Sequence, residues 1–247
     1  MSLVPYSYQR AFASKQTSDS CVVQIAGHTL NLKQVQEACE SEESLDAGDS
    51  EEVRFGDQAR ESPLRNVGLR VWQSAFILTE YLARCPPFGQ WADTQVLDLG
   101  TGTGITGIFL ALEGARVVLT DLEHITPLTR RNVDLNCKAL VQDRARVVEY
   151  CWGDPIDDLG IRPDIITVAD CLYEPENYEA LASTVVGACE AHTRVYIAFR
   201  RRGRQERSFL GMLESANFHL VEVPQDHLHE EFRTGDYFVV WGSKIGG

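Results

Sequence analysis

The sequence predicts an α/β fold in which helices cover both faces of a mainly parallel sheet. An apolar segment at 96–99 runs into three closely spaced glycines, Gly100, Gly102 and Gly104, and then into a helical pattern that begins at Ile105. A strand, a glycine turn and a helix form a unit whose backbone N–H groups and helix N-terminus can bind a polar ligand. Further apolar strand-like segments alternate with helical segments along the chain. At 247 residues the chain is long enough for one such domain.

Composition limits the classes of function. The net charge of −13 repels phosphate backbones, so no nucleic-acid partner is expected and a basic protein surface is the more natural partner. No signal peptide is recognisable, and no apolar run approaches the roughly 20 residues that cross a bilayer, so no membrane partner is expected. The seven cysteines contain no C-x-x-C pair, and the histidines do not group with carboxylates. We therefore expect no metal site and no disulfide framework, in a cytoplasmic or alternatively nuclear protein.

We expect an N-terminal extension at 1–66, followed by the main domain at 67–247. Apolar residues alternate on both sides of Ala26 and Gly27. This pattern predicts a β-hairpin at about 21–33 that forms a flap outside the main sheet.

An acidic segment follows the hairpin. Residues 37–52 contain eight acids and a single large apolar residue, Leu45. Such a composition buries too little apolar surface to offset the entropy of ordering, so we expect a mobile loop. It is either a solvated insertion or an attractor for a basic partner.

Apolar residues at helical spacing predict a helix at 68–83 that ends before Pro86. Trp72 falls in its first turns. A tryptophan there packs in the core or, because it lies just ahead of the glycine strand, contacts a cofactor.

The glycine turn fits two classes of cofactor. Gly102, Gly104 and Gly107 satisfy the G-x-G-x-x-G pattern of dinucleotide-binding proteins. However, Asp98 lies two residues before the first glycine, where a carboxylate would repel a pyrophosphate and favour the ammonium group of a methionine moiety. Asp98 therefore favours S-adenosylmethionine (SAM) over a nicotinamide cofactor.

The next predicted strand, 116–121, ends in Asp121, 17 residues beyond Gly104. An acid at this place can accept hydrogen bonds from both ribose hydroxyls of an adenosine cofactor. The alternative role, capping a helix that begins near His124, suits Glu123 better.

Two further strands carry candidate site residues. A helix is predicted at 124–137 and a strand at 145–150, and Trp152 follows that strand, where its ring packs on adenine or in the core. A fourth strand at 163–169 delivers Asp170 and Tyr173 to the point where ligands bind in doubly wound sheets.

The remaining segments complete the predicted sheet. Helices are expected at 176–191 and 205–216, and strands at 193–199, 218–223 and 236–241. A basic cluster lies in this part of the chain and comprises Arg200, Arg201, Arg202, Arg204 and Arg207. We expect a solvated turn and helix flank, with docking of an acidic partner as the alternative.

Taken together, these motifs resemble the family 16 protein methyltransferases, whose glycine motif is followed by a D-x-x-Y motif and which include several lysine methyltransferases. The resemblance rests on residues 96–104, Asp121, Trp152 and Gly153, and the motif at 170–173. It covers the chain from about residue 67 to the C-terminus. It implies a seven-strand Rossmann-like sheet of the class I SAM-dependent type, with the hairpin as an extension.

The resemblance also implies roles for individual residues. Cofactor contacts are implied for Trp72, Gly100, Thr101, Gly102, Asp121, Trp152 and Ala169. Asp170 and Tyr173 are implied to shape the channel for the substrate lysine. Gln73, Asp98 and Pro175 depart from the family pattern, and Pro175 and the acidic segment lie where the substrate would be selected.

The implied activity is SAM-dependent transfer of a methyl group to a lysine of a protein substrate, with S-adenosylhomocysteine as product. Within the family, the resemblance is greatest to the methyltransferase that acts on valosin-containing protein, a hexameric AAA ATPase, which makes that ATPase the implied partner. We expect a monomer. The alternatives are methylation of a nucleic-acid base or small molecule, a non-catalytic SAM-binding module, and a nicotinamide oxidoreductase.

Overall fold

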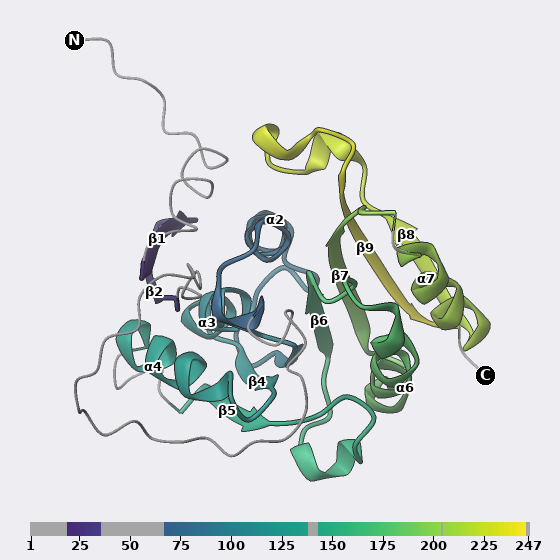
Figure 1. Ribbon diagram of the computed structural model, residues 1–247, viewed down its shortest axis with the longest axis horizontal. Helices are drawn as coiled ribbons and strands as arrows, with labels where there is room; N and C mark the ends of the chain where they lie inside the picture. Colours follow the sequence, from purple (N-terminus) through teal and green to yellow (C-terminus); the bar gives the residue numbers. More distant parts are fainter. Residues whose placement is uncertain (1–18, 36–66, 138–142, 204, 246–247) are drawn as a thin grey trace, which may run out of the picture.

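The computed structural model describes residues 19–35, 67–137, 143–203 and 205–245, and confirms the predicted α/β fold (Figure 1). The strands of the central sheet are β3 (Gln95–Leu99), β4 (Arg116–Asp121), β5 (Ala145–Glu149), β6 (Ile165–Ala169), β7 (Arg194–Arg200), β8 (Phe218–Glu222) and β9 (Tyr237–Lys244). The α-helices are α2 (Gln73–Arg84), α3 (Ile105–Leu112), α4 (Thr126–Asn136), α6 (Tyr178–Ala188) and α7 (Glu206–Ser215). Short 3-10 helices span Val67–Leu69, Ile156–Leu159, Pro175–Asn177, Gln225–His227 and Glu230–Phe232.

The strands follow the order β5-β4-β3-β6-β7-β9-β8. All neighbours from β5 to β7 are parallel, whereas β9 runs antiparallel between β7 and β8. The dinucleotide-binding fold has the order 3-2-1-4-5-6 and lacks this inserted antiparallel strand. The chain reverses its winding direction between β3 and β6, so ligands are expected at the carboxyl ends of these two strands.

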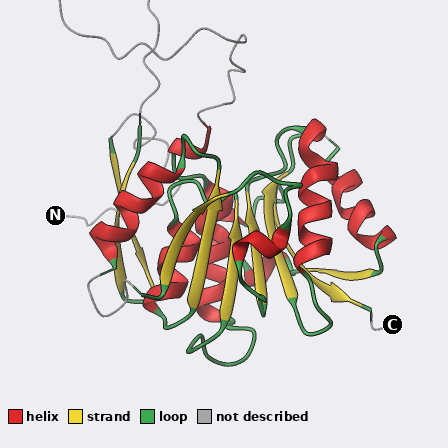
Figure 2. Ribbon diagram, turned by 90° about the horizontal axis from the view of Figure 1, so that it is seen from below, coloured by secondary structure: helices red, strands yellow, loops and turns green. Residues whose placement is uncertain are grey.

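Side chains of the sheet alternate between two cores on its opposite faces. In β3, Val96 faces the core shared with α2 and α3, whereas Leu97 and Leu99 face the core shared with α6 and α7. Figure 2 shows the strands side by side, with helices flanking the sheet. Because both faces are covered, the strands read in the sequence as continuous apolar runs.

The predicted hairpin forms a separate two-stranded sheet of β1 (Ser20–Ile25) and β2 (His28–Lys33). Its apolar side chains are buried in the same core as α2 and α3, and they are Cys21, Val23, Ile25, Leu30 and Leu32. The hairpin predicted outside the main sheet is thus confirmed, and it is docked on the main domain.

Two asparagines of α4 dock the hairpin. The Asn132 side chain accepts a hydrogen bond from Lys33 N (2.7 Å) and donates to Lys33 O (3.1 Å) and Thr103 O (2.9 Å). Asn136 pairs in the same way with the backbone N–H and carbonyl of Asn31. The amides thus take the place of a neighbouring strand at the edge of β2. Since Thr103 belongs to the glycine turn, Asn132 also joins the hairpin to that turn.

The chain after the hairpin explains where α2 begins. The Gln34 side chain accepts a hydrogen bond from Val71 N (2.8 Å), and Val35 N donates to Leu69 O (3.1 Å). These bonds fix the backbone at Leu69 and Val71, and Trp72 itself has an extended backbone, so α2 begins at Gln73 and not at the predicted residue 68. The predicted acidic loop at 37–52 lies outside the described residues.

Other element bounds differ from the sequence prediction for local reasons. Helix α4 begins at Thr126 and not at His124, and Pro127 occupies its first turn, where a missing N–H is tolerated. Helix α6 begins at Tyr178, after a 3-10 turn. Strand β9 continues to Lys244, because it pairs with both β7 and β8.

Asp98 lies beneath the glycine turn and is only 2% exposed. Its Oδ2 accepts a hydrogen bond from Thr101 Oγ1 (2.5 Å), and its Oδ1 accepts one from Thr167 Oγ1 (2.6 Å). Burial raises the pKa of this carboxyl to about 6, although the hydrogen bonds oppose the shift. The carboxylate thus ties the turn to β6, and it does not face the surface on which a cofactor ammonium was expected.

Replacing Asn132 with Ala leaves the part-buried N–H and carbonyl of Lys33 and the buried carbonyl of Thr103 without this partner. We predict a loss of about 2 kcal/mol in the free energy of unfolding, since each unsatisfied buried group costs roughly 1–3 kcal/mol. The matched control is Asn136→Ala, whose bonds to Asn31 are exposed and should cost less than half as much. Urea denaturation measures both losses, and equal losses would contradict the docking role of Asn132.

Replacing Asp98 with Asn tests the effect of its burial. The fold raises the pKa of this carboxyl, so ionised Asp98 destabilises the protein above about pH 6, and protonation relieves this cost as the pH falls towards 4. Relative to Asp98→Asn, the wild type should gain about 1 kcal/mol of stability between pH 7 and pH 5. A stability difference that does not change with pH would show that Asp98 does not carry this cost.

Candidate cofactor and substrate site

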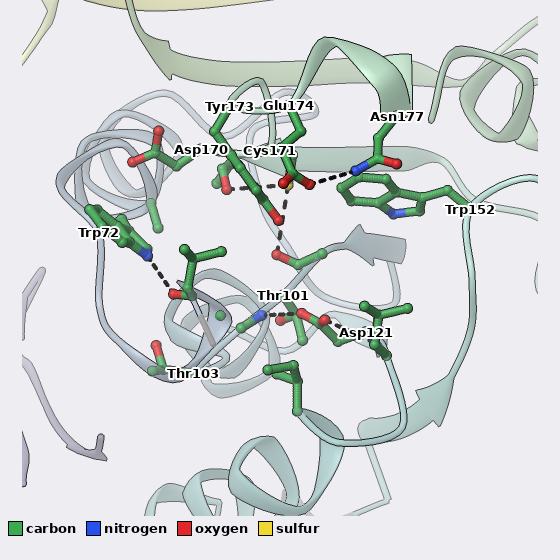
Figure 3. Close-up of a pocket in the computed structure, with 18 of the residues that line it drawn as sticks. Trp72, Thr101, Thr103, Asp121, Trp152, Asp170, Cys171, Tyr173, Glu174 and Asn177 are labelled. Atoms are coloured by element: carbon green, nitrogen blue, oxygen red, sulfur yellow. Dashed lines mark hydrogen bonds between the residues drawn. The ribbon is translucent and has the colours of Figure 1, made fainter. Parts of the chain in front are cut away.

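A cavity of about 380 Å³ lies at the carboxyl ends of β3, β4 and β6 (Figure 3). With the exception of Asp98, every site residue expected from the sequence lines it, and these residues are Trp72, Gly100, Thr101, Gly102, Asp121, Trp152, Ala169, Asp170 and Tyr173. The volume is within the range of roughly 300–1,000 Å³ that is common for small-molecule sites. The structure thus brings residues from distant segments to one place.

The floor of the cavity is the backbone of the glycine turn. A Cβ on Gly102, which has a φ of +55°, would lie 2.8 Å from the carbonyl oxygen of Gly68. A Cβ on Gly100 would lie 2.7 Å from Cys171 Sγ and 2.9 Å from Trp152 Cζ2. Since real Cβ atoms essentially never approach so closely, both positions require glycine. The glycines therefore allow the turn to pack closely against the segment before α2 and against Trp152 and Cys171.

Asp121 is at the end of β4 and braces the glycine turn from the side. Its Oδ2 accepts a hydrogen bond from Gly102 N (2.7 Å), and its Oδ1 accepts one from Leu122 N (2.8 Å). Burial raises the pKa of this carboxyl. Each carboxylate oxygen has a further acceptor position that can serve a ligand hydroxyl. Asp121 does not cap α4, whose preceding residue is Ile125 and has no side-chain cap.

Two tryptophans line opposite parts of the cavity (Figure 3). Trp72 Nε1 donates a hydrogen bond to Val67 O (2.7 Å), which fixes the ring against the segment ahead of α2. Trp152 is half-buried, packs against the core shared with α6 and α7, and covers Gly100. The two interpretations offered for Trp152, core packing and ligand contact, are thus compatible.

The loop after β6 carries Asp170 and Tyr173. Asp170 has a left-handed backbone with a φ of +58°, a conformation that aspartate adopts more readily than most residues. Its N–H donates to Ala198 O (2.8 Å) in the neighbouring strand β7. Its carboxylate is 4% exposed and lines the cavity with Tyr173. Burial raises the pKa of the Tyr173 phenol well above its ordinary value, which keeps the phenol neutral.

Arg202 is a cavity residue that the sequence analysis did not single out. Its Nη1 donates to Asp170 Oδ1 at 2.8 Å, so this arginine is not a solvated member of the basic cluster. In contrast, Arg200 lies near Asp236 and Arg201 lies over the ring of Phe238. The loop that carries Arg202 follows β7, the parallel neighbour of β6, and so emerges beside the loop that carries Asp170.

The part of the chain that the structure describes was compared with the needs of a cysteine nucleophile, a metal site and a membrane-spanning helix. Burial raises the pKa of the Cys171 thiol well above its ordinary value, so this thiol is not a ready nucleophile. In that part no group of three or more His, Cys, Asp or Glu side chains could hold a metal ion. There is also no helix there with the length and apolar character needed to span a membrane.

Comparison with known proteins identifies the family. The sequence model described as "Lysine methyltransferase" matches residues 52–216. Mouse protein N-lysine methyltransferase METTL21A is 31% identical over 145 residues, which cover 58% of this chain and 66% of the relative. Mouse EEF1A lysine methyltransferase 3 is 31% identical over 161 residues, which cover 65% and 68%. The chain thus spans about two thirds of the length of these curated relatives.

The fold agrees with this family. The 16S rRNA methyltransferase RsmC of T. thermophilus, solved with AdoMet and guanosine, superposes with a TM-score of 0.58 at 16% identity, over 92% of this chain and 50% of that one. Such a likeness shows the fold alone. The predicted seven-strand sheet and the choice of SAM over a nicotinamide cofactor are thus confirmed. The chain belongs to the lysine methyltransferase family of class I SAM-dependent enzymes.

Proposed function

We propose that this protein is a SAM-dependent protein-lysine N-methyltransferase. The proposal rests on one observation: Asp170 and Tyr173 open into the same cavity as the glycine turn and Asp121. A cofactor surface and a substrate surface are therefore within reach of each other. The names of the relatives, which describe lysine methyltransferases, support the same chemistry.

The cavity residues fit SAM. The further acceptor positions of Asp121 suit the two ribose hydroxyls, and the half-buried face of Trp152 suits an adenine ring. Gly100 and Gly102 line the same cavity, so the backbone of the glycine turn lies within reach of the rest of the cofactor. When bound, SAM supplies a methyl group on a positively charged sulfur.

The substrate amine has to be neutral before it can attack that methyl group. A free lysine has a pKa of about 10.4, so only about one in 2,500 is neutral at pH 7. The proposed role of Asp170 and Tyr173 is to hold the amine in line with the methyl group. Positioning of this kind can contribute roughly 7–11 kcal/mol to lowering the barrier.

Two proteins are candidate substrates. We propose valosin-containing protein, which the sequence resemblance implies, as the first candidate. A second candidate is EEF1A, after which one of the relatives, EEF1A lysine methyltransferase 3, is named. From the use of cysteine in the sequence we propose a cytoplasmic location, with the nucleus as the alternative.

Asp121→Ala should reduce the affinity for S-adenosylhomocysteine at least about tenfold. The substitution removes charge-assisted acceptors worth roughly 1.5–3 kcal/mol each, and 1.4 kcal/mol corresponds to a factor of ten. The matched control is Glu149→Ala, because Glu149 pairs with Asp121 across β4 and β5 but does not line the cavity. Calorimetry measures both affinities. Unchanged affinity in Asp121→Ala would remove Asp121 from the cofactor site.

Methyl-labelled SAM tests the activity directly. The wild type, incubated with a cell extract, should label a protein on lysine, which mass spectrometry identifies. Asp170→Asn should keep its affinity for S-adenosylhomocysteine within a few fold and lose most of this label. Label in nucleic acid or small molecules would contradict the protein substrate. Intact cofactor binding with no label in any fraction would favour a non-catalytic binding module.

A further inference from the structure

The ion pair between Asp170 and Arg202 is the most enclosed contact between opposite charges in the cavity. The carboxylate is 4% exposed, the arginine side chain is 26% exposed, and Nη1 lies 2.8 Å from Oδ1. Arg202 is itself fixed, since its backbone N–H donates to Glu206 Oε1 (2.6 Å) at the start of α7. The pair therefore joins the loops that follow β6 and β7.

Arg202 balances the negative charge of Asp170, because the neighbouring ionisable groups are neutral. The ionisable groups that face it, besides Arg202, are Cys171, Tyr173 and Tyr237. Burial raises the pKa of all three, so they are neutral near pH 7. The other charged residues lining the cavity are Arg70, Asp121 and Glu174. Arg202 is the cation in direct contact with the carboxylate.

An unpaired carboxylate at this place would hinder the proposed reaction. An opposite charge within about 4–6 Å stabilises the charged form of a group and shifts its pKa by about 1–3. Without Arg202, Asp170 would thus raise the pKa of the substrate lysine and keep it as an ammonium, which cannot attack the methyl group. A carboxylate has four acceptor positions, and the contact with Arg202 uses one of them.

We propose that Arg202 is a positioning residue that fixes Asp170 and cancels its charge, so that the substrate amine meets a hydrogen-bond acceptor with no net negative charge. The amine can then be oriented without being held in its protonated form. This inference rests on the proposed lysine methyltransferase function. It assigns to one member of the basic cluster a role in the reaction.

The test compares pH profiles of methyl transfer at saturating labelled SAM and saturating protein substrate. Arg202→Met removes the charge and should move the pH of half-maximal rate up by about one unit. Arg202→Lys keeps the charge and should stay within about 0.3 unit of the wild type. The matched control is Arg201→Met, which removes a charge from the same loop but not from the cavity, and it should match the wild type.

A double variant covers the case in which Arg202→Met folds poorly because it leaves a buried carboxylate alone. Asp170→Asn combined with Arg202→Met removes both charges, so it should recover the wild-type melting temperature. Its residual rate should show no upward shift in pH. Calorimetry with S-adenosylhomocysteine should give an affinity within a few fold of the wild type for every variant.

Each contrary outcome has a distinct meaning. An unshifted pH profile in Arg202→Met, with only a lower rate or melting temperature, would show that the ion pair is structural and would overturn the role of Arg202. An equal shift in the double variant would overturn it as well, because the carboxylate would then not be the cause. If the wild type transferred no methyl to lysine at any pH, the proposed function itself would fail, and the inference with it.

Discussion

The close packing of backbone around the glycine turn is the constraint on which the site depends. Gly102 approaches the carbonyl of Gly68 so closely that no side chain fits between them. The turn is also held from below by Asp98 and from the side by Asp121. These contacts fix three separate segments around one short loop. A ligand resting on the loop therefore meets groups whose positions are already set.

The hairpin belongs to this arrangement, although it is far from the turn in the sequence. Asn132 joins β2 to Thr103, and Gln34 fixes the backbone of Val71 just before the cavity residue Trp72. The wall of the cavity formed by the segment before α2 thus depends on residues that precede residue 36. An N-terminal element that reads as an appendage in the sequence shares the core of the main domain.

Much of the fold could be predicted because its signals are local. Three parts of the site each follow an apolar run with a recognisable end. They are the glycine turn after β3, Asp121 at the end of β4, and the loop after β6. The face of the sheet on which Asp98 lies could also be predicted, because side chains alternate along β3. This alternation places Asp98 on the same face as Val96 and opposite Leu97 and Leu99. The contact of Arg202 with Asp170 could not be read in this way. It depends on the adjacency of β6 and β7 and on the path of a long side chain across a loop.

We propose that one cavity presents an adenosine cofactor to a substrate lysine, and a crystal structure with S-adenosylhomocysteine tests this arrangement most directly. We predict both ribose hydroxyls on the Asp121 carboxylate, the adenine against Trp152, and the sulfur facing Asp170 and Tyr173, with the contact between Asp170 and Arg202 intact. A ligand bound elsewhere, or bound with its sulfur directed away from Asp170, would contradict this arrangement.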